Sequence, residues 1–209
     1  MADMAQIARA VEGGRRKVVD QLVREALAEG VKAETILNEG LVVGMTNLGE
    51  QFKNGEVYVP EVLVAARAMK TGTEILKPLL VAENVQSLGT VAIGTVEGDL
   101  DVFGMNLVGM MLEGSGFTVM DLGVDVKPEM FIDAVRGGAK IIGMSALLTT
   151  TMPMMAKVIE RLKDEGLRDQ VKVMIGGAPI TQEYADEIGA DGYSSDAASA
   201  AELAKRLIA

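Results

Sequence analysis

The sequence contains neither cysteine nor histidine, and each absence excludes whole classes of function. Without cysteine there is no disulfide framework and no thiolate metal site. Without histidine the chain lacks the commonest metal ligand and general base, so a Ser-His-Asp triad is excluded. Aromatic residues are only 3% of the chain. Methionine, whose flexible side chain fills gaps between packed helices, occurs 14 times.

Long apolar runs and excess positive charge are also missing. No run approaches the roughly 18 apolar residues of a membrane span, and residues 1–11 lack the apolar centre of a signal peptide. The net charge of −10 disfavours nucleic acid, whose phosphates require clustered cations. We therefore expect a cytoplasmic protein that binds neither membrane nor nucleic acid. The 209 residues, 49% hydrophobic, suffice for one large domain or two small ones.

The first 84 or so residues carry apolar side chains at helical spacing, which predicts four helices. Such a bundle could stand alone or cap another domain. Residues 82–88 have the composition of a linker, so we place the domains at 1–86 and 87–209. The helices are expected near 5–11, over 18–27 with Gly30 as the stop, over 36–52 before Asn54-Gly55, and from Pro60 to just before Pro78.

The second half alternates apolar strands with amphipathic helices, which predicts a parallel sheet with helices on both faces. Right-handed crossovers leave two common strand orders, and the presence of five strands favours the order 2-1-3-4-5. The switch point of this order lies between the first and third strands. Strands are expected at 91–96, 117–122, 141–146, 171–175 and 192–193, and helices at 104–113, 128–135, 152–165, 182–188 and 197–207.

The loops at this switch point, 97–104 and 145–151, have unusual compositions, as does 176–179 beside them. The first carries two aspartates, the second a string of hydroxyls, and the third a glycine pair that permits close backbone approach. Small and hydroxyl-bearing residues describe a slot for a flat or elongated ligand. No phosphate-binding glycine motif is present. A receiver-like Mg²⁺ site at Asp99 and Asp101 is the alternative, but residues 189–195 lack the lysine it needs.

Motifs from both halves occur in a specific order and spacing: Leu48-Gly49-Glu50-Gln51-Phe52, Gly55-Glu56, Val59-Pro60-Glu61, Gly98-Asp99 with Gly104 and Asn106-Leu107-Val108-Gly109, Asp121-Leu122-Gly123-Val124-Asp125, Ser145-x-Leu147, Gly176-Gly177-Ala178-Pro179 and Gly189-Ala190-Asp191-Gly192-Tyr193. Together they resemble the corrinoid proteins of microbial methyltransferase systems and the cobalamin-binding module of methionine synthase. The resemblance covers nearly the whole chain. It implies a four-helix cap followed by a flavodoxin-like (Rossmann-like) five-stranded parallel sheet of order 2-1-3-4-5.

In that family the first loop reads Asp-x-His-x-x-Gly, and its histidine is the lower axial ligand of cobalt. The cofactor's own dimethylbenzimidazole then sits in a slot lined by the Ser-x-Leu strand and the Gly-Gly loop. Here Asp101 stands at the histidine position, so the resemblance implies base-off cobalamin without direct histidine ligation. Asp101 either reaches cobalt through a water molecule or only caps a helix. The implied cofactor-binding residues are Asp99, Asp101, Val102, Phe103, Gly104, Ser145, Leu147, Thr149, Gly176, Gly177 and Tyr193.

The resemblance leaves three functions open. The first is a non-catalytic carrier that passes a methyl group on cobalt between corrinoid-dependent methyltransferase subunits, with a reductive activator as a further partner. Such a carrier is expected to be a monomer or a weak oligomer. The second is cobalamin binding or storage without methyl cycling, which the missing histidine favours. The third is a domain that has lost the cofactor and only docks proteins, against which Ser145 and Gly176-Gly177 argue.

Overall fold

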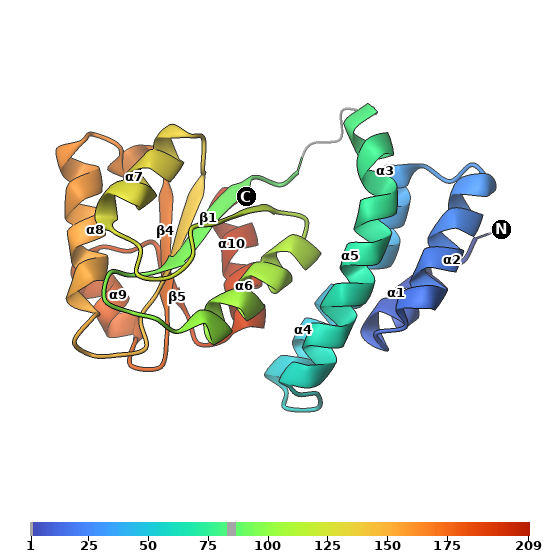
Figure 1. Ribbon diagram of the computed structural model, residues 1–209, viewed down its shortest axis with the longest axis horizontal. Coiled ribbons are helices and arrows are strands. Elements are labelled where there is room, and N and C mark those ends of the chain that lie inside the picture. Colours follow the sequence, from blue (N-terminus) through green and yellow to red (C-terminus); the bar gives the residue numbers. More distant parts are fainter. Residues whose placement is uncertain (1, 83–86) are drawn as a thin grey trace. The chain divides into compact units, whose positions relative to one another are not determined.

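Two compact units make up the chain in the computed structural model, which describes residues 2–82 and 87–209 (Figure 1). The first unit runs to Ser87 and also includes Gly114–Gly116, and the second comprises Leu88–Glu113 and Phe117–Ala209. Residues 83–86, on which the predicted linker and the end of the first domain fall, lie outside the described residues. Among the described helices, none has both the length and the apolar character that a membrane crossing requires.

The first unit is helical, as predicted, and its helices bury the apolar stripes seen in the sequence. Val19, Val23, Leu41 and Leu48 are each at most 1% exposed. The third predicted helix contains a π-helical stretch that apolar periodicity did not indicate. The elements are α1 (Met4–Glu12), α2 (Arg16–Ala28), the continuous helix formed by α3 (Ala33–Thr35), η1 (Ile36–Val42) and α4 (Val43–Lys53), and α5 (Val59–Ala82).

The predicted end of the last of these helices before Pro78 is wrong. Helix α5 continues through Pro78 to Ala82. A proline inside a helix removes one backbone hydrogen bond, here the one to the carbonyl of Glu74. Only four helical residues follow Pro78, and the turns before it are held by the buried side chains of Met69 and Leu76. Tertiary packing therefore overrides the local stop signal.

The second unit contains a five-stranded parallel sheet of order β2-β1-β3-β4-β5, which confirms the predicted fold. The strands are each within two residues of the predicted bounds. Strand β1 lies between β2 and β3, so the chain reverses direction across the sheet at the β1/β3 boundary. The strands are β1 (Thr90–Thr95), β2 (Thr118–Asp121), β3 (Ile141–Ser145), β4 (Lys172–Gly176) and β5 (Gly192–Ser194).

Five helices cover the two faces of this sheet (Figure 1). On one face, α7 (Pro128–Arg136), α8 (Pro153–Asp164) and α9 (Gln182–Ile188) enclose the main core, with Phe131 fully buried. On the other face, α6 (Val102–Gly114) packs on Ile93 through Gly109, where an added Cβ would lie 2.9 Å from the Ile93 Cδ1. Helix α10 (Ala197–Ile208) packs there on Gly192 through Leu203.

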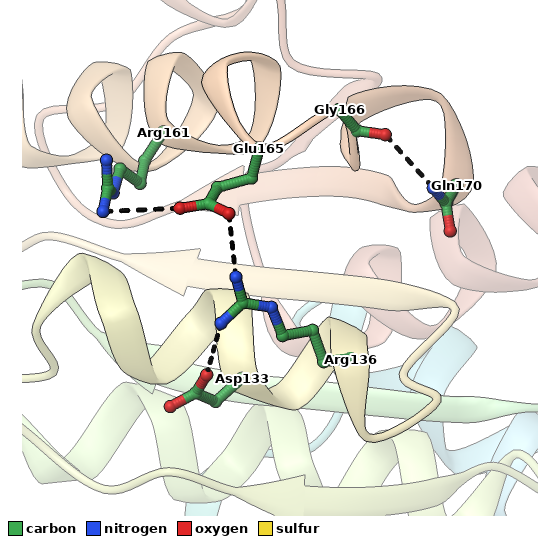
Figure 2. A network of polar contacts seen from close by, with 6 residues as sticks. All are labelled: Asp133, Arg136, Arg161, Glu165, Gly166 and Gln170. Carbon is green, nitrogen blue, oxygen red and sulfur yellow. Dashed lines mark hydrogen bonds and ion pairs between the residues drawn. The ribbon is translucent and has the colours of Figure 1, made fainter.

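An ion-pair network joins α7 to α8 near the ends of both helices (Figure 2). Arg136 donates to Asp133 at 3.1 Å and to Glu165 at 2.8 Å, and Glu165 also pairs with Arg161 at 3.4 Å. The 3₁₀ turn η2 (Arg168–Gln170), absent from the prediction, follows beside it. Both helices end where the chain returns to the amino edge of the sheet, so the network lies opposite the carboxyl ends of the strands.

Candidate binding site

A row of small residues crosses the carboxyl edge of the sheet. The register pairs Thr95 of β1 with Ser145 of β3, Ser145 with Gly176 of β4, and Gly176 with Ser194 of β5. Paired residues in a parallel sheet point to the same face. Met144 and Ile175, which precede Ser145 and Gly176, belong to the core beneath α7 and α8. The paired residues therefore face the other way, toward α6 and α10. We call this set the small-residue row: Thr95, Ser145, Gly176 and Ser194.

The glycine in this row leaves room that a side chain would take. A Cβ added at Gly176 would lie 3.0 Å from the Ser194 carbonyl oxygen. Apart from the residues adjacent to Gly176 in the chain, Ser194 is the only described residue with atoms within 4 Å of that Cβ. Gly176 and Ser145 are half-buried, whereas Gly143, one row deeper on the same face, is buried. The sheet surface is therefore more accessible at Ser145 and Gly176 than one row deeper, at Gly143.

Asp99, in the loop after β1, links the two loops that flank the switch point. Its carboxylate Oδ2 accepts the Leu147 N–H at 2.6 Å and the Thr151 hydroxyl at 3.0 Å, and its Oδ1 accepts the Asp101 N–H at 3.1 Å. The residue is only 1% exposed. The resemblance implied that Asp99 is one of the cofactor-binding residues. The structure shows it fastening the β1 loop to the β3 loop.

The environment of Asp99 also sets its charge. Burial raises the pKa of a carboxyl group, but the N–H donors of Leu147, Asp101 and Leu148 and the Thr151 hydroxyl outweigh burial and lower the pKa of Asp99 below its ordinary value. The carboxylate is therefore ionised at neutral pH. Its charge is stabilised by these neutral donors.

The β4 loop is brought against the β3 loop by Gly177. Its φ of +125° is one that side-chain-bearing residues rarely adopt, and an added Cβ would lie 3.0 Å from the Ala146 backbone nitrogen and closer still to the Ala146 carbonyl group. Farther along, the Tyr184 hydroxyl donates to the Met152 carbonyl at 2.7 Å, which ties α9 to the start of α8. The three predicted loops are thus assembled as expected.

Asp101 immediately precedes α6, whose first residues are Val102 and Phe103. Its Oδ2 lies 3.6 Å from the position of a Cβ on Gly104, so the carboxylate sits beside the first turn of the helix. Negative charge at a helix N-terminus is stabilising. Among the described residues, no group of three or more acidic side chains is arranged to hold a metal ion.

Other predicted site residues are placed differently. The Leu147 side chain is 46% exposed and Thr149 is exposed in the turn after β3, so both border the carboxyl edge. Tyr193 pairs with Ile175 and packs against the core beneath α8 and α9, on the opposite face from Ser194. The structure therefore does not bring the Tyr193 side chain to the small-residue row.

Sequence reasoning did not single out Thr95 or Ser194, and it named Asp125 only as part of a family motif. Thr95 is fully buried, and its hydroxyl donates to the Asp99 carbonyl at 2.6 Å. A lone threonine inside an apolar strand is the signal that could have identified it. Ser194 could have been found from strand alternation, since it follows Tyr193 and must face the other way.

Comparison with known proteins defines the class. A B12-binding domain model matches residues 89–202, and a second B12-binding domain model matches residues 4–77. Trimethylamine corrinoid protein 1 of Methanosarcina acetivorans is 46% identical over 180 residues, covering 85% of this chain and 83% of that protein.

Two solved structures extend the likeness across the chain. A cobalamin-binding protein from Desulfitobacterium hafniense DCB-2 has a TM-score of 0.85 and 30% identity, with all of both chains covered. A chain of the methanol:cobalamin methyltransferase complex from Methanosarcina barkeri has a TM-score of 0.84 and 29% identity, covering 98% of this chain and 79% of that one. The chain belongs to the B12-binding corrinoid proteins, as the sequence motifs indicated.

The residues present fit one part of cobalamin and not another. The small-residue row leaves the space at Gly176 that a bound group would fill. Direct ligation of cobalt by an imidazole of the protein is impossible, because the sequence has no histidine. The residues of the site are therefore compatible with an organic group on the small-residue row, and they are not compatible with a cobalt atom ligated by a histidine of the protein.

Asp99→Asn should lower the free energy of unfolding of the second unit by about 1–3 kcal/mol at neutral pH, because one buried donor loses its acceptor. Because the pKa of Asp99 is lowered on folding, its contribution is complete above the ordinary pKa of about 3.9 and decreases as pH falls below it. Urea denaturation should therefore show the difference between variant and wild type shrinking below about pH 4.

Asp133→Asn is the matched control, because Asp133 is 72% exposed in its ion pair. It should change the free energy of unfolding by less than about 1 kcal/mol. If the difference in free energy of unfolding between Asp99→Asn and wild type stays constant from neutral to acid pH, this would contradict the conclusion that an ionised Asp99 joins the β1 and β3 loops.

Proposed function

We propose that this protein is a corrinoid carrier, which binds cobalamin on its second unit and shuttles a methyl group between partner methyltransferases. The single observation that carries the proposal is the small-residue row at the carboxyl edge of the sheet, in a chain of the B12-binding family. Bound cobalamin supplies the cobalt atom that accepts and releases the methyl group. The chain's own contribution is to bind, orient and shield the cofactor.

The tail of the cofactor, with its dimethylbenzimidazole detached from cobalt, is proposed to lie on the small-residue row. Gly176 gives it space, and within the described part of the chain the hydroxyl groups of Ser145 and Ser194 have no partner that would compete for a hydrogen bond to it. Gly177 holds the β4 loop against the β3 loop, so the row keeps its shape. The exposed Leu147 and Thr149 follow β3 at the same carboxyl edge of the sheet.

Asp101 is proposed to replace the family's histidine without ligating cobalt directly. A carboxylate is shorter and harder than imidazole, and here it sits beside the first turn of α6. Contact with cobalt through a water molecule suits this position. We also propose that the cap comprises residues 1–86 and the cofactor domain residues 87–209, as the sequence indicated.

A second function, cobalamin storage without methyl cycling, is favoured by the absence of histidine. A histidine ligand with its supporting carboxylate tunes the reactivity of a bound metal, and a storage protein has no need of such tuning. Methyl transfer assayed with a partner methyltransferase distinguishes the two: a carrier is methylated and demethylated, whereas a storage protein binds cobalamin and remains inert.

The proposed partners are corrinoid-dependent methyltransferase subunits with a basic docking face, followed by a reductive activator. Residues 78–126 contain no lysine or arginine, and they include Asp99, Asp101, Asp121 and Asp125 around the β1 and β2 ends. The negative electrostatic potential of these carboxylates steers association with a positively charged surface. The Methanosarcina barkeri relative was crystallised in a methyltransferase complex, which supports a carrier that docks on a methyltransferase. The carrier itself is proposed to be a monomer or a weak oligomer.

Gly176→Leu should weaken cobalamin binding by at least about tenfold, because the side chain would fill the space proposed for the tail. Gly176→Ala should weaken binding less, since within the described chain its Cβ meets only atoms of Ser194, the carbonyl oxygen at 3.0 Å and the hydroxyl oxygen at 3.6 Å. Titration of the purified protein with cobalamin, followed by visible absorption, measures both.

Lys140→Leu is the control, because Lys140 is exposed in the turn before β3, at the opposite edge of the sheet. It adds a leucine without touching the row and should bind cobalamin like wild type. Thermal unfolding of each variant shows whether the fold is kept. Tight cobalamin binding by a folded Gly176→Leu protein would refute the proposed tail site.

Asp101→His should introduce a nitrogen ligand to cobalt, provided that Asp99 Oδ1, which accepts one N–H here, also accepts the ring N–H. The probe is cobinamide, which lacks dimethylbenzimidazole, so that nitrogen splitting in the electron paramagnetic resonance of its Co(II) form can come only from the protein. The variant should show splitting and wild type should not. Splitting in the wild-type protein would contradict the absence of a protein nitrogen ligand.

A further inference from the structure

One residue outside the proposed cofactor contacts holds an unfavourable backbone conformation at the edge of the site. Asp125, in the loop between β2 and α7, has a φ of +54°, the one positive value among non-glycine residues of the described chain. The left-handed region is uncommon for residues with a Cβ, although aspartate and asparagine tolerate it better than most. Such a conformation persists where neighbouring contacts enforce it.

Three hydrogen bonds connect Asp125 to the β1 loop. Its Oδ1 accepts the Gly98 N–H at 2.7 Å. Its own N–H is shared between the Asp99 carbonyl at 2.9 Å and the Thr95 hydroxyl oxygen at 3.1 Å. These bonds use the side chain and the backbone of Asp125 together, at a residue whose φ is positive.

The segment around Asp125 also runs alongside the end of β1 as an extra piece of parallel pairing. The Thr95 N–H donates to the Gly123 carbonyl at 3.1 Å, the Val126 N–H donates to the Thr95 carbonyl at 3.0 Å, and Val96 forms a bridge with Val126. The β2 loop thus lies against the β1 loop on the side away from β3.

We propose that Asp125 is a positioning residue for the corrinoid site, which holds Gly98 and Asp99 in the binding conformation before the cofactor arrives. The Asp99 carbonyl is fixed by Asp125 and Thr95, and the Asp99 carboxylate at the other end of the same residue reaches Leu147 and Thr151. Releasing the carbonyl frees the residue to turn and withdraws its carboxylate from the β3 loop. The proposal rests on the proposed function for its ligand, but not for its geometry.

The test compares three substitutions. Asp125→Asn keeps both the acceptor oxygen and the tolerance for positive φ, Asp125→Gly keeps only the conformation, and Asp125→Ala keeps neither. Asp133→Ala, which removes an exposed aspartate from α7, is the control. Two quantities are measured: hydrogen exchange of the Leu147 amide in the cofactor-free protein, and the dissociation constant for cobalamin.

Asp125→Ala should speed exchange of the Leu147 amide and raise the dissociation constant about tenfold, Asp125→Gly should be intermediate, and Asp125→Asn and Asp133→Ala should match wild type. Exchange at Met174, in the middle of β4, should not change. The proposal is overturned if Leu147 exchange is unaffected by Asp125→Ala, if Met174 responds equally, if Asp125→Asn fails to rescue, or if cobalamin affinity is unchanged. If wild type binds no cobalamin, the proposed function fails, while the exchange data still decide whether Asp125 positions the loop.

Discussion

A buried carboxylate holds this site together. Asp99 lies at the end of β1 with both oxygens occupied by donors, and two of those donors, Leu147 and Thr151, come from the loop after β3. Burying a charge is costly unless hydrogen bonds compensate it. Here they do, and they lower the pKa of Asp99 so that the charge persists at neutral pH. The two βα loops are therefore joined by a short, charge-assisted bond that sets the shape of the switch point.

That bond depends on the sheet topology. Asp99 reaches Leu147 only because β1 and β3 are neighbours in the order 2-1-3-4-5. The same order places α6 and α10 on one face, near opposite edges of the sheet, with β3 between the strands that they cover. On this face, little side-chain volume projects from the middle of the sheet, because Gly143, Ser145 and Gly176 are small residues. Polar anchoring at the loops and the absence of bulk on the strands together produce a surface suited to an elongated ligand.

Much of the fold was predictable because its signals are local and repeated. Alternating strand and helix patterns gave the five strands within two residues, and crossover handedness reduced the strand order to two candidates. The end of helix α5 was predicted wrongly from Pro78, because the helix is stabilised by packing of buried side chains, and a local stop signal in the sequence carries no information about that packing. Tyr193 was assigned to the site from its motif, yet strand alternation places its side chain in the core and Ser194 on the site face.

The hydrogen-bond partners of Asp99 were less predictable, since they are distant in the sequence. Leu147 lies 48 residues after Asp99, and Thr151 lies 52 residues after it. The family motif implied only that Asp99 is a cofactor-binding residue. The structure shows Asp99 bonded to the backbone and to Thr151. We propose that the family's binding surface is kept and that Asp101 gives the position of the cobalt ligand a different chemistry.

The measurement that tests this account most directly is the visible absorption spectrum of cobalamin bound to the protein, compared with cobinamide. Our account predicts that bound cobalamin takes on the spectrum of the base-free form and binds more tightly than cobinamide, because the detached tail lies on the small-residue row. A bound cobalamin that keeps the spectrum of the base-coordinated form, or that binds no better than cobinamide, would contradict it.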